Sequence, residues 1–409
     1  MARLSVLSLH TSPLTQPGAG DGGGMNVYVR ELCAAMARRG SSVDVFTRRE
    51  DPRAPDAVEV EPGVRVHHVD AGPARPIEKE RLEGYVEAFT AGVLAEMTAA
   101  PEPYDAVHAN YWLSGVAGHK VKHELDLPLL VTFHTAERIK AATSGEPLSR
   151  RATEEAAIAG CADAVLASCE VEAAQLTSLL GVPADRVVTV PLGVDHAYFG
   201  PGDRAQARRA LGIGGDGPLL LFCGRLQALK GADLAIATLA ELVRRGGDHR
   251  LVVVGGPSGP GGEGFAASLR ERARDGRVLD RVSFVAPRPH ELLGTYYRAA
   301  DACLVPSRAE SFGLVALEAA ACGAPVVASD VGGLATLVVV DGATGRLLGS
   351  RSVTAWADAV EWATSGALRA MRLSTAAVLR AQPFTWRAAA TRLDVVVESV
   401  RDACLVSCA

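Results

Sequence analysis

The chain has 409 residues, of which 48% are hydrophobic and 22% are charged, a balance typical of a globular protein. This length exceeds what one hydrophobic core usually supports, so we expect two domains. The net charge of −5 gives no electrostatic reason to expect binding to nucleic acid or to an anionic membrane, and no apolar run is long enough to span a bilayer.

The N-terminus and the cysteines both favour a cytoplasmic protein. The opening residues, MARLSVLSLHTS, turn polar too soon for a signal peptide and are typical of a first strand. The eight cysteines are scattered without CxxC or Cys/His metal spacing, so we expect buried thiols and not a disulfide framework.

Strand-like apolar runs alternate with helical patterns in the first half of the chain. Helices are predicted at 25–39 and 79–97 from the spacing of their apolar residues. Strands are predicted at 4–10, 42–46, 64–69, 106–109, 128–133, 164–167 and 187–190.

The first strand leads to the first helix through GDGGGMN, residues 20–26. Three consecutive glycines leave the backbone of such a turn open, which is typical of a loop that meets a ligand. A phosphate cradle and an ordinary flexible loop both fit this stretch.

A Gly- and Pro-rich stretch at 194–218 separates this half from a second strand–helix series. Continuous apolar runs suit parallel strands that are buried on both faces. We therefore predict two doubly wound α/β domains that bind ligands in the cleft between them, near the carboxyl ends of the strands. The second series of strands is predicted at 219–225, 250–256, 282–286, 302–307 and 325–330.

The predicted boundaries follow from this pattern. They are an N-terminal Rossmann-like domain at 1–195, a linker at 196–215, a C-terminal Rossmann-like domain at 216–380 and a C-terminal segment at 381–409. Within the last segment, 384–400 has the pattern of an amphipathic helix that packs back on either domain.

The stretch PSRAESFGLVALEAAACGAPVVAS, residues 306–329, carries the strongest chemical signal. Glu310 and Glu318 lie eight residues apart, and Gly313 between them permits the turn that opens a helix. A helix N-terminus suits a diphosphate, and carboxylates accept hydrogen bonds from sugar hydroxyls. An isolated pair of glutamates would more often be a solvated helix face, but the PSxxESFG context favours a binding site.

Two cations and a glycine-rich loop follow other strands of the second half. Arg225 and Lys230, in GRLQALKG, lie at the carboxyl end of a predicted strand, where a phosphate would need positive charge. Two surface basic residues without a binding role would give the same sequence pattern. The loop at 252–264 lacks GxGxxG and GxxxxGK[ST], so a phosphate cradle and a flexible turn remain equal interpretations. The missing GxGxxG also argues against a dehydrogenase.

Polar side chains of the first half fall at strand ends or just beyond them, where an acceptor would be held. His134 taken alone could equally be a core histidine with its hydrogen bonds satisfied. Tyr111 and Trp112 are residue types that more often serve packing than function. The whole set comprises His10, Asn26, Lys79, Tyr111, His134, Thr135 and Arg151.

Together these motifs resemble family 4 of the retaining glycosyltransferases, which have the GT-B fold of two Rossmann-like domains. ESFGLVALEAAACGAPVVASDVGG and GRLQALKG carry the resemblance, with Glu310 and Glu318 as the E-x7-E pair. LHTSPLTQPGAGDGGGMNVYVREL and NYWLSG are similar to the branch that glycosylates D-inositol 3-phosphate in mycothiol biosynthesis, and sucrose-phosphate synthases share this branch.

The resemblance implies a donor site and a set of catalytic residues. The catalytic group is His134, Arg225, Lys230 and Glu310, in which His134 positions the sugar and the two cations clamp the diphosphate. The donor site is implied at Gln16, Pro17, Gly24, Arg225, Lys230, Arg288, Glu310, Ser311, Phe312, Gly313, Leu314 and Glu318.

The resemblance also implies an acceptor site, a structural magnesium site and a homodimer. No cofactor is expected to be needed for the chemistry. The acceptor site is implied at His10, Asp21, Gly22, Gly23, Gly24, Met25, Asn26, Lys79, Tyr111, Thr135 and Arg151, and the magnesium at Tyr297, Arg298, Ala300 and Ala324.

The acceptor side departs from the family pattern. HANYWLSG replaces HSHYWLSG, and the segment 136–151 is about four to six residues shorter than the family pattern leads us to expect. LQALKG stands where the family usually has IQPLKA. In PLGVD, residues 191–195, Leu-Gly stands where the family often has Asn-Gly or Pro-Gly. Three functions therefore stay open: transfer of N-acetylglucosamine from UDP to 1D-myo-inositol 3-phosphate, transfer from a UDP- or GDP-sugar to another small acceptor of specialised metabolism, and sugar-nucleotide binding without activity.

Overall fold

A computed structural model describes residues 2–18, 20, 22–145, 147–215, 217–259, 261–335 and 339–407. The chain divides into two compact units. Unit 1 comprises Met1–Thr15, Gly24–Gly193 and Trp386–Ala409, and unit 2 comprises Gln16–Gly23 and Val194–Thr385. The glycine loop at 20–26 is therefore shared, because its first part belongs to unit 2 and Gly24 begins a helix of unit 1.

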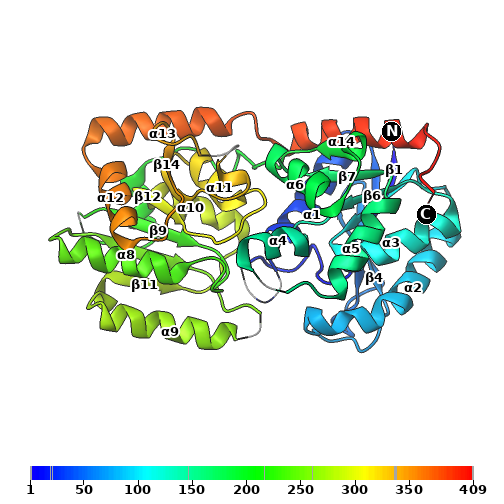
Figure 1. The fold of residues 1–409 in the computed structure, drawn as a ribbon, viewed down its shortest axis with the longest axis horizontal. Coiled ribbons are helices and arrows are strands. Elements are labelled where there is room, and N and C mark those ends of the chain that lie inside the picture. The colour runs from blue at the N-terminus through cyan, green and yellow to red at the C-terminus, as the bar shows by residue number, and fades with distance from the viewer. Residues whose placement is uncertain are drawn as a thin grey trace. The chain divides into compact units, whose positions relative to one another are not determined.

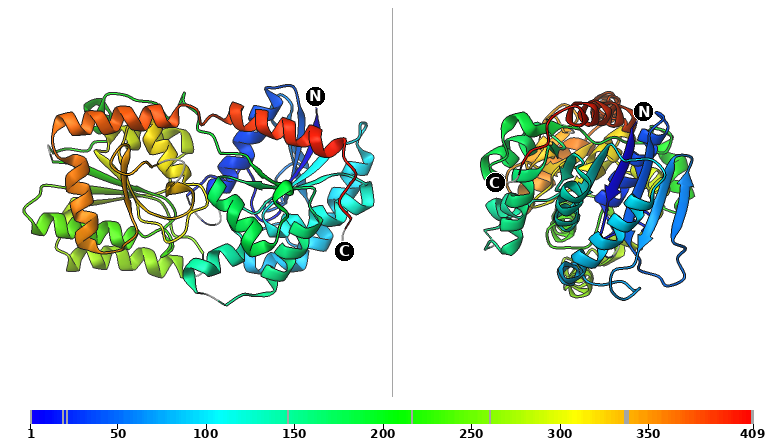
Figure 2. Two further views of the ribbon diagram at one scale, coloured as in Figure 1. Left: turned by 45° about the horizontal axis from the view of Figure 1, so that its top comes forward. Right: turned by 90° about the vertical axis from the view of Figure 1, so that its right-hand side faces the viewer.

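Unit 1 is built on an eight-stranded sheet, counted over the described residues, with the order β3-β4-β2-β1-β5-β6-β7-β8. Within it only β3 runs antiparallel to its neighbour. The right panel of Figure 2 looks onto this unit and shows helices on both sides of the strands. Its strands are β1 (Arg3–Leu7), β2 (Ser42–Arg48), β3 (Ala57–Glu61), β4 (Val64–Val69), β5 (Ala106–Asn110), β6 (Leu129–Thr132), β7 (Ala164–Ala167) and β8 (Val187–Thr189).

Several helices of unit 1 contribute apolar side chains to a core that they share with the sheet. Phe89, Leu113 and Ile158, from three of them, share one apolar core with Phe46 of β2. The helices are α1 (Gly24–Ala37), η1 (Lys79–Tyr85), α2 (Val86–Ala99), α3 (Trp112–Leu125), α4 (Glu137–Ser144), α5 (Arg150–Cys161), α6 (Glu170–Leu180), η2 (Ala184–Arg186) and α14 (Trp386–Arg401).

Unit 2 contains a six-stranded sheet, again over the described residues, in the order β11-β10-β9-β12-β13-β14, with every pair parallel. Apolar runs such as LLLFC and RLVVV are buried on both faces because helices cover both sides (Figure 1). Its strands are β9 (Leu219–Cys223), β10 (Arg250–Val254), β11 (Val282–Val285), β12 (Ala302–Val305), β13 (Val326–Ser329) and β14 (Gly345–Leu348).

The helices of unit 2 enclose a second core around Phe222 and the fully buried Trp356. Helix α8 packs on α9 and α11 packs on α13, and in Figure 1 α9 lies at the bottom of this unit and α13 at its top. The helices are α7 (Arg204–Ala210), α8 (Ala232–Arg244), α9 (Gly262–Asp275), η3 (Leu279–Arg281), η4 (His290–Leu292), α10 (Leu293–Ala299), α11 (Leu314–Ala321), α12 (Val353–Thr364) and α13 (Ala367–Ala381).

The predicted strands all form, and the differences lie at edges and ends. The helix predicted at 79–97 is divided into η1 and α2 at Tyr85, whose φ of −111° and ψ of 0° interrupt the helix. The strands β3 and β14 are absent from the prediction, because AVEVE is largely exposed at a sheet edge and GRLL is short.

The C-terminal segment returns to unit 1. Helix α14 packs on α1 (Figures 1 and 2), where Arg39 Nε lies 2.6 Å from Asp394 Oδ2 and the Trp386 ring contacts the Tyr28 ring edge-on. None of the described helices combines the length and apolar character that a membrane span requires.

Residues 204–210, in the segment expected to link the domains, form α7 of unit 2. Arg204 Nη1 donates to Asp301 Oδ1 over 2.7 Å, and Arg208 donates to the other oxygen of the same carboxylate. Asp301 also accepts from the main-chain N–H of Leu219 at the start of β9, so α7 is tied to the sheet.

The described cysteines depart in part from the prediction of buried thiols. Cys161 is disulfide-bonded, Cys404 is exposed and Cys223 is half-buried. The other described cysteines are thiols, namely Cys33, Cys169, Cys223, Cys303, Cys322 and Cys404.

The close approach of two strand ends in unit 2 predicts a glycine requirement. Gly255 has φ +154°, and a Cβ there would lie 1.9 Å from Gly224 O. We expect Gly255→Ala to lower the free energy of unfolding by roughly 1–3 kcal/mol, because the backbone must move apart. The matched control is Gly264→Ala in α9, where a Cβ meets no described atom within 4 Å and a helical alanine should stabilise slightly. Urea unfolding measures both, and equal midpoints would contradict the requirement.

Candidate functional site

In each sheet the strand order reverses at one place, between β9 and β12 in unit 2 and between β1 and β5 in unit 1. Ligands of doubly wound folds bind beyond the carboxyl ends of the strands at such a reversal. The loops after these four strands carry most of the residues predicted for donor and acceptor binding.

In unit 2 the loops after β9 and β12 are joined through their main chains. Arg308 N donates to Leu229 O over 2.8 Å. Gly231 has φ +77°, and a Cβ there would lie 2.2 Å from Pro306 O, so only glycine permits this contact. The side chains of the two loops are thereby held close together.

Lys230 and Glu310 meet across these loops. Lys230 Nζ lies 2.6 Å from Glu310 Oε2, and Ser307 Oγ donates to the same oxygen over 3.4 Å. Both charged side chains are half-buried, with 24% and 19% of their surface exposed. Partial burial strengthens the attraction between the two charges, and the ammonium still reaches solvent.

The segment from Glu310 to Gly313 leads into α11 and rests on two glycines that the sequence analysis missed. A Cβ at Gly332 would lie 1.7 Å from Glu310 O, and Gly333 N donates to Ser311 O over 3.0 Å. Gly313, with φ +99°, is the N-cap of α11 and has no side chain to cap the first turn. The N–H groups of Leu314 and the next residues can therefore serve an anion. The VGG triplet after β13 is the sequence signal for this support.

Glu318 is buried in α11 and is bound on both oxygens. His290 Nε2 lies 2.5 Å from Oε1, and the Tyr297 hydroxyl donates to Oε2 over 2.7 Å. Burial raises the pKa of Tyr297 well above its ordinary value, so the phenol remains a donor to the carboxylate. His290 was not predicted, and its single appearance in PRPHEL gives no periodic signal.

Arg225 contacts the predicted N-terminal glycine loop. Its Nη1 donates to Ser258 Oγ over 3.5 Å, and a Cβ at Gly23 would lie 3.3 Å from its Nε. Ser258 in turn donates to Gly20 O, so the loop at 252–264 holds a peptide segment of the same unit. Gln16, Pro17 and Gly22 belong to that segment, and Asp21 lies outside the described residues.

Arg288 follows β11 and is exposed, and its neighbour Pro287 lies against Gly18, where a Cβ would be 3.4 Å away. Phe312, on the loop before α11, is buried and its ring lies 6.1 Å from that of Phe384.

The residues predicted for a structural magnesium ion offer it no acidic side chain. Tyr297 binds Glu318, and Arg298 donates to Tyr198 O over 3.0 Å. Ala300 and Ala324 could supply only main-chain carbonyls, whereas Mg²⁺ is usually held by one or two carboxylates. The side chains present therefore fit this ion poorly, and no step of the proposed mechanism involves it.

In unit 1, Tyr111 and His134 have the left-handed backbone that non-glycine residues seldom adopt. Tyr111, after β5, has φ 75°, and His134, after β6, has φ 61°. Such strain is stored mainly at functional sites, where surrounding contacts hold it. Both residues were predicted from the sequence, although nothing in the sequence shows their backbone angles.

Arg151 binds two of the other predicted acceptor residues. Its Nη1 donates to the Tyr111 hydroxyl over 2.9 Å, and its Nη2 donates to Thr135 O. Its Nε donates to the buried Glu155 over 2.6 Å. The His10 ring lies 4.4 Å from the Tyr111 ring, at an angle of 44° to it.

His134 is a half-buried, neutral histidine. Its Nε2 lies 2.9 Å from the amide oxygen of Asn110, which can only accept, so Nε2 carries the proton. Burial, followed by repulsion from His108 and His10, lowers the pKa of His134 to about 3. A neutral imidazole with one fixed N–H suits positioning of a sugar hydroxyl.

The remaining acceptor predictions lie at the beginning of α1 and of η1. Asn26 is buried, and its Nδ2 donates to Thr11 Oγ1 and Ser12 O, both over 2.7 Å. It therefore shapes the loop after β1. Gly24 and Met25 form the first turn of α1, and Lys79 begins η1 with an ion pair of 3.9 Å to Glu80.

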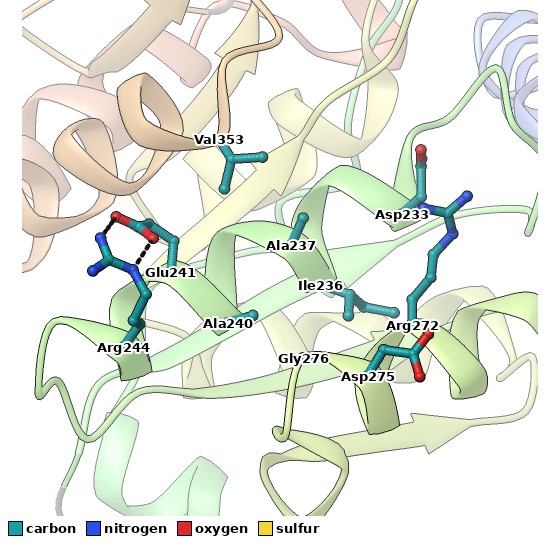
Figure 3. Close-up of a pocket in the computed structure, with 10 residues that line it drawn as sticks. All are labelled: Asp233, Ile236, Ala237, Ala240, Glu241, Arg244, Arg272, Asp275, Gly276 and Val353. Carbon is teal, nitrogen blue, oxygen red and sulfur yellow. Dashed lines mark hydrogen bonds and ion pairs between the residues drawn. The ribbon is translucent and has the colours of Figure 1, made fainter.

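A separate hollow of about 500 Å³ lies between α8 and α9 of unit 2 (Figure 3). Two of the charged residues that line it are paired with each other, because Arg244 donates twice to Glu241, over 2.7 and 2.6 Å. None of the predicted donor residues lines it. Its lining is Asp233, Ile236, Ala237, Ala240, Glu241, Arg244, Arg272, Asp275, Gly276 and Val353.

Comparison with known proteins finds relatives over the whole chain. A family model described as "Glycosyl transferases group 1" matches residues 203–379, and one described as "Glycosyl transferase 4-like domain" matches residues 23–193. The D-inositol 3-phosphate glycosyltransferase of Actinosynnema mirum is 46% identical over 412 residues, covering 98% of each chain. That of Kineococcus radiotolerans is 44% identical over 419 residues, covering 98% of this chain and 96% of its own.

Solved structures agree on the fold. Sucrose-phosphate synthase from Thermosynechococcus elongatus has a TM-score of 0.91 at 32% identity, covering 98% of this chain and 99% of its own. Anabaena HepE, solved with UDP and glucose, has a TM-score of 0.75 at 19% identity, covering 98% of this chain and 100% of its own, and supports the fold alone. The prediction of two doubly wound α/β domains of the GT-B type is confirmed.

The lowered pKa of His134 predicts a pH-dependent contribution to stability. Its folded pKa of about 3 lies below the ordinary 6.5, so between these pH values the imidazole is protonated in the unfolded chain and neutral in the folded chain. The contribution is complete above about pH 6.5 and falls as the pH drops toward 3. We expect the melting-temperature difference between wild type and His134→Asn to shrink from pH 7 to pH 4. The exposed His196→Asn serves as control, and a difference independent of pH for His134→Asn would contradict the burial argument.

Proposed function

We propose that this chain, which belongs to the group 1 glycosyltransferases of family 4, transfers N-acetylglucosamine from UDP to 1D-myo-inositol 3-phosphate. The enzyme class follows from the two family models and from relatives 44–46% identical over 98% of the chain. The donor and the acceptor are the proposal.

The Lys230–Glu310 pair beside the N-terminus of α11 carries this proposal. An ammonium 2.6 Å from a carboxylate, with Gly313 three residues further on, forms a site in which a diphosphate finds a cation and uncapped N–H groups. Arg225, which follows β9 as Lys230 does, adds a second cation. Binding of the diphosphate would draw Lys230 toward its oxygens and release Glu310 for the hydroxyls of the sugar.

The transfer is proposed to proceed with retention. The bond between the anomeric carbon and the diphosphate oxygen breaks, and a bond from the acceptor oxygen to the same carbon forms on the same face. The acceptor proton passes to a diphosphate oxygen, so the products are the glycoside and UDP. Arg225, Lys230 and the first turn of α11 stabilise the charge that develops on the leaving group.

Glu318 and His134 have supporting roles in this scheme. The Glu318 carboxylate is oriented by His290 and Tyr297 and retains lone pairs for ribose hydroxyls. His134 is neutral at physiological pH and donates or accepts a hydrogen bond without taking the acceptor proton. The sugar is thereby positioned by groups that do not change charge during the reaction.

Arg151 supports an anionic acceptor. A guanidinium has five N–H donors, and its bonds to Tyr111, Thr135 and Glu155 use three of them. The other two can bind a phosphate in a bidentate manner. Tyr111 and Thr135, which Arg151 holds, provide polar groups for the hydroxyls of a cyclitol.

A second candidate is transfer to a different small anionic acceptor. The short segment at 136–151 favours it, because Glu137 in α4 accepts from Ser149 N and Oγ over 3.1 and 2.7 Å and so closes this segment on itself. A changed segment beside Arg151 would alter which ring fits there and leave the anion contact unchanged.

The direct test is incubation of the purified protein with UDP-N-acetylglucosamine and 1D-myo-inositol 3-phosphate, followed by mass spectrometry for the glycoside and UDP. We expect product with this pair and little with unphosphorylated myo-inositol or with a GDP-sugar. UDP release that needs another anionic acceptor would support the second candidate. A protein that binds UDP yet releases none with any acceptor would refute the proposal.

The diphosphate clamp predicts a large kinetic effect of two substitutions. Arg225→Ala and Lys230→Ala should each lower kcat by roughly 10²–10³, as expected for groups that stabilise developing charge. Lys120→Ala is the control, because Lys120 is exposed and its ion pair with Glu87 is 4.0 Å long. Steady-state kinetics with saturating donor measure the effect. Near wild-type turnover in both variants would contradict the role of Arg225 and Lys230 in stabilising the leaving group.

A further inference from the structure

Helix α3 carries two histidines one turn apart, His119 and His123, that face the end of α5. Their rings lie 4.9 Å apart with an angle of 76° between them. His123 Nε2 is 3.4 Å from Cys161 Sγ, and one donor atom from each of the three residues lies within 4.8 Å of the others. None of these side chains belongs to the donor or acceptor residues described above.

These separations match those of ligands on one tetrahedral ion. With bonds of about 2.3 Å to sulfur and about 2.0–2.1 Å to nitrogen, two ligand atoms of a tetrahedral zinc lie roughly 3.5 Å apart. The His123–Cys161 pair is already at this separation. Rotation of an imidazole about its side-chain torsions is enough to bring the third atom within range, because the cluster spans no more than 4.8 Å.

The main chain around Cys161 is fixed by a buried ion pair. Lys122, between the two histidines in sequence, donates to Cys161 O over 2.8 Å and lies 2.6 Å from Asp163 Oδ2. Asp163 also accepts from Leu129 N and from Val406 N, each over 2.7 Å. The same turn of α3 that presents the histidines therefore positions the cysteine, as supporting groups do in metal sites.

The charge beside the cluster does not oppose a cation. A neutral imidazole has the lone pair that a cation needs. The positive charge of Lys122 is largely balanced by Asp163, with both side chains at most 5% exposed.

We propose that His119, His123 and Cys161 form a binding site for Zn²⁺ when Cys161 is a thiol. Two imidazoles and a thiolate suit a borderline-soft divalent cation, whereas Mg²⁺ and Ca²⁺ prefer oxygen ligands. Binding displaces the thiol proton and joins α3 to the end of α5. A fourth ligand would be water.

The disulfide at Cys161 makes this site depend on redox state. A dithiol reductant transfers two electrons and two protons to the disulfide, which yields two thiols and the oxidised dithiol. The disulfide and the zinc complex use the same sulfur, so each form excludes the other. The zinc site is therefore expected in the reduced protein and absent from the oxidised one.

The test uses the full chain, reduced with a dithiol, freed of reductant and metal under inert gas, and titrated with Zn²⁺ alone by calorimetry. We expect one Zn²⁺ per chain. His119→Ala, His123→Ala and Cys161→Ala should each weaken the affinity by about tenfold or more, because each removes a direct ligand. The oxidised chain should lose affinity to the same degree as Cys161→Ala.

Matched controls and a spectroscopic readout keep the test decisive. Cys33→Ala removes a buried thiol, and His196→Ala an exposed histidine, both outside the cluster, so each should bind Zn²⁺ as wild type does. Co²⁺ in place of Zn²⁺ should give a thiolate-to-cobalt charge-transfer band in the reduced wild type and none in Cys161→Ala. No binding, binding that the three substitutions leave unchanged, or a band that persists without Cys161 would each overturn the proposal.

Discussion

Main-chain contact between the loops after β9 and β12 is the constraint on which the donor half depends. Gly231 lies directly against Pro306 O, and Leu229 O accepts from Arg308 N. Strands that are neighbours in a sheet lie about 4.7–4.9 Å apart, so loops that leave them together can share hydrogen bonds. A side chain at Gly231 would separate these loops, and Lys230 would lose its 2.6 Å contact with Glu310. The chemistry thus rests on an absent side chain as much as on charged ones.

The acceptor half is constrained differently, through side chains that hold a strained backbone. Tyr111 has positive φ directly after β5, and Arg151 from α5 binds its hydroxyl and covers its ring at 4.7 Å. His134 has the same kind of backbone after β6 and is held by Asn110 at the end of β5. The strain is of order 1–3 kcal/mol per residue and persists because these contacts leave each side chain one position.

Apolar runs and their spacing were enough to predict both sheets, because strands buried on two faces need continuous hydrophobic sequence. The edge strands β3 and β14 escaped prediction, since β3 is largely exposed and β14 opens with a glycine and an arginine and so lacks a continuous apolar run. Charged site residues such as Lys230 and Glu310 could be named from their motifs. His290, Gly332 and Gly333 could not, because their roles depend on Glu318 and Glu310 being brought near them by the fold. His119 and His123 do carry a signal, an i,i+4 pair in HKVKH, but Cys161 joins them only in three dimensions.

The path of the chain between the two units has a consequence for how this protein can be divided. The polypeptide passes from one unit to the other after Thr15, Gly23, Gly193 and Thr385. A single cut near residue 194 would leave unit 2 without the segment Gln16–Gly23 that Ser258 binds through Gly20, and unit 1 without α14. Neither unit is thus a contiguous piece of sequence. A chimera of two relatives joined at a single point would combine, within each unit, segments that come from different proteins. Only replacements that respect all four passages would keep each unit with its own segments.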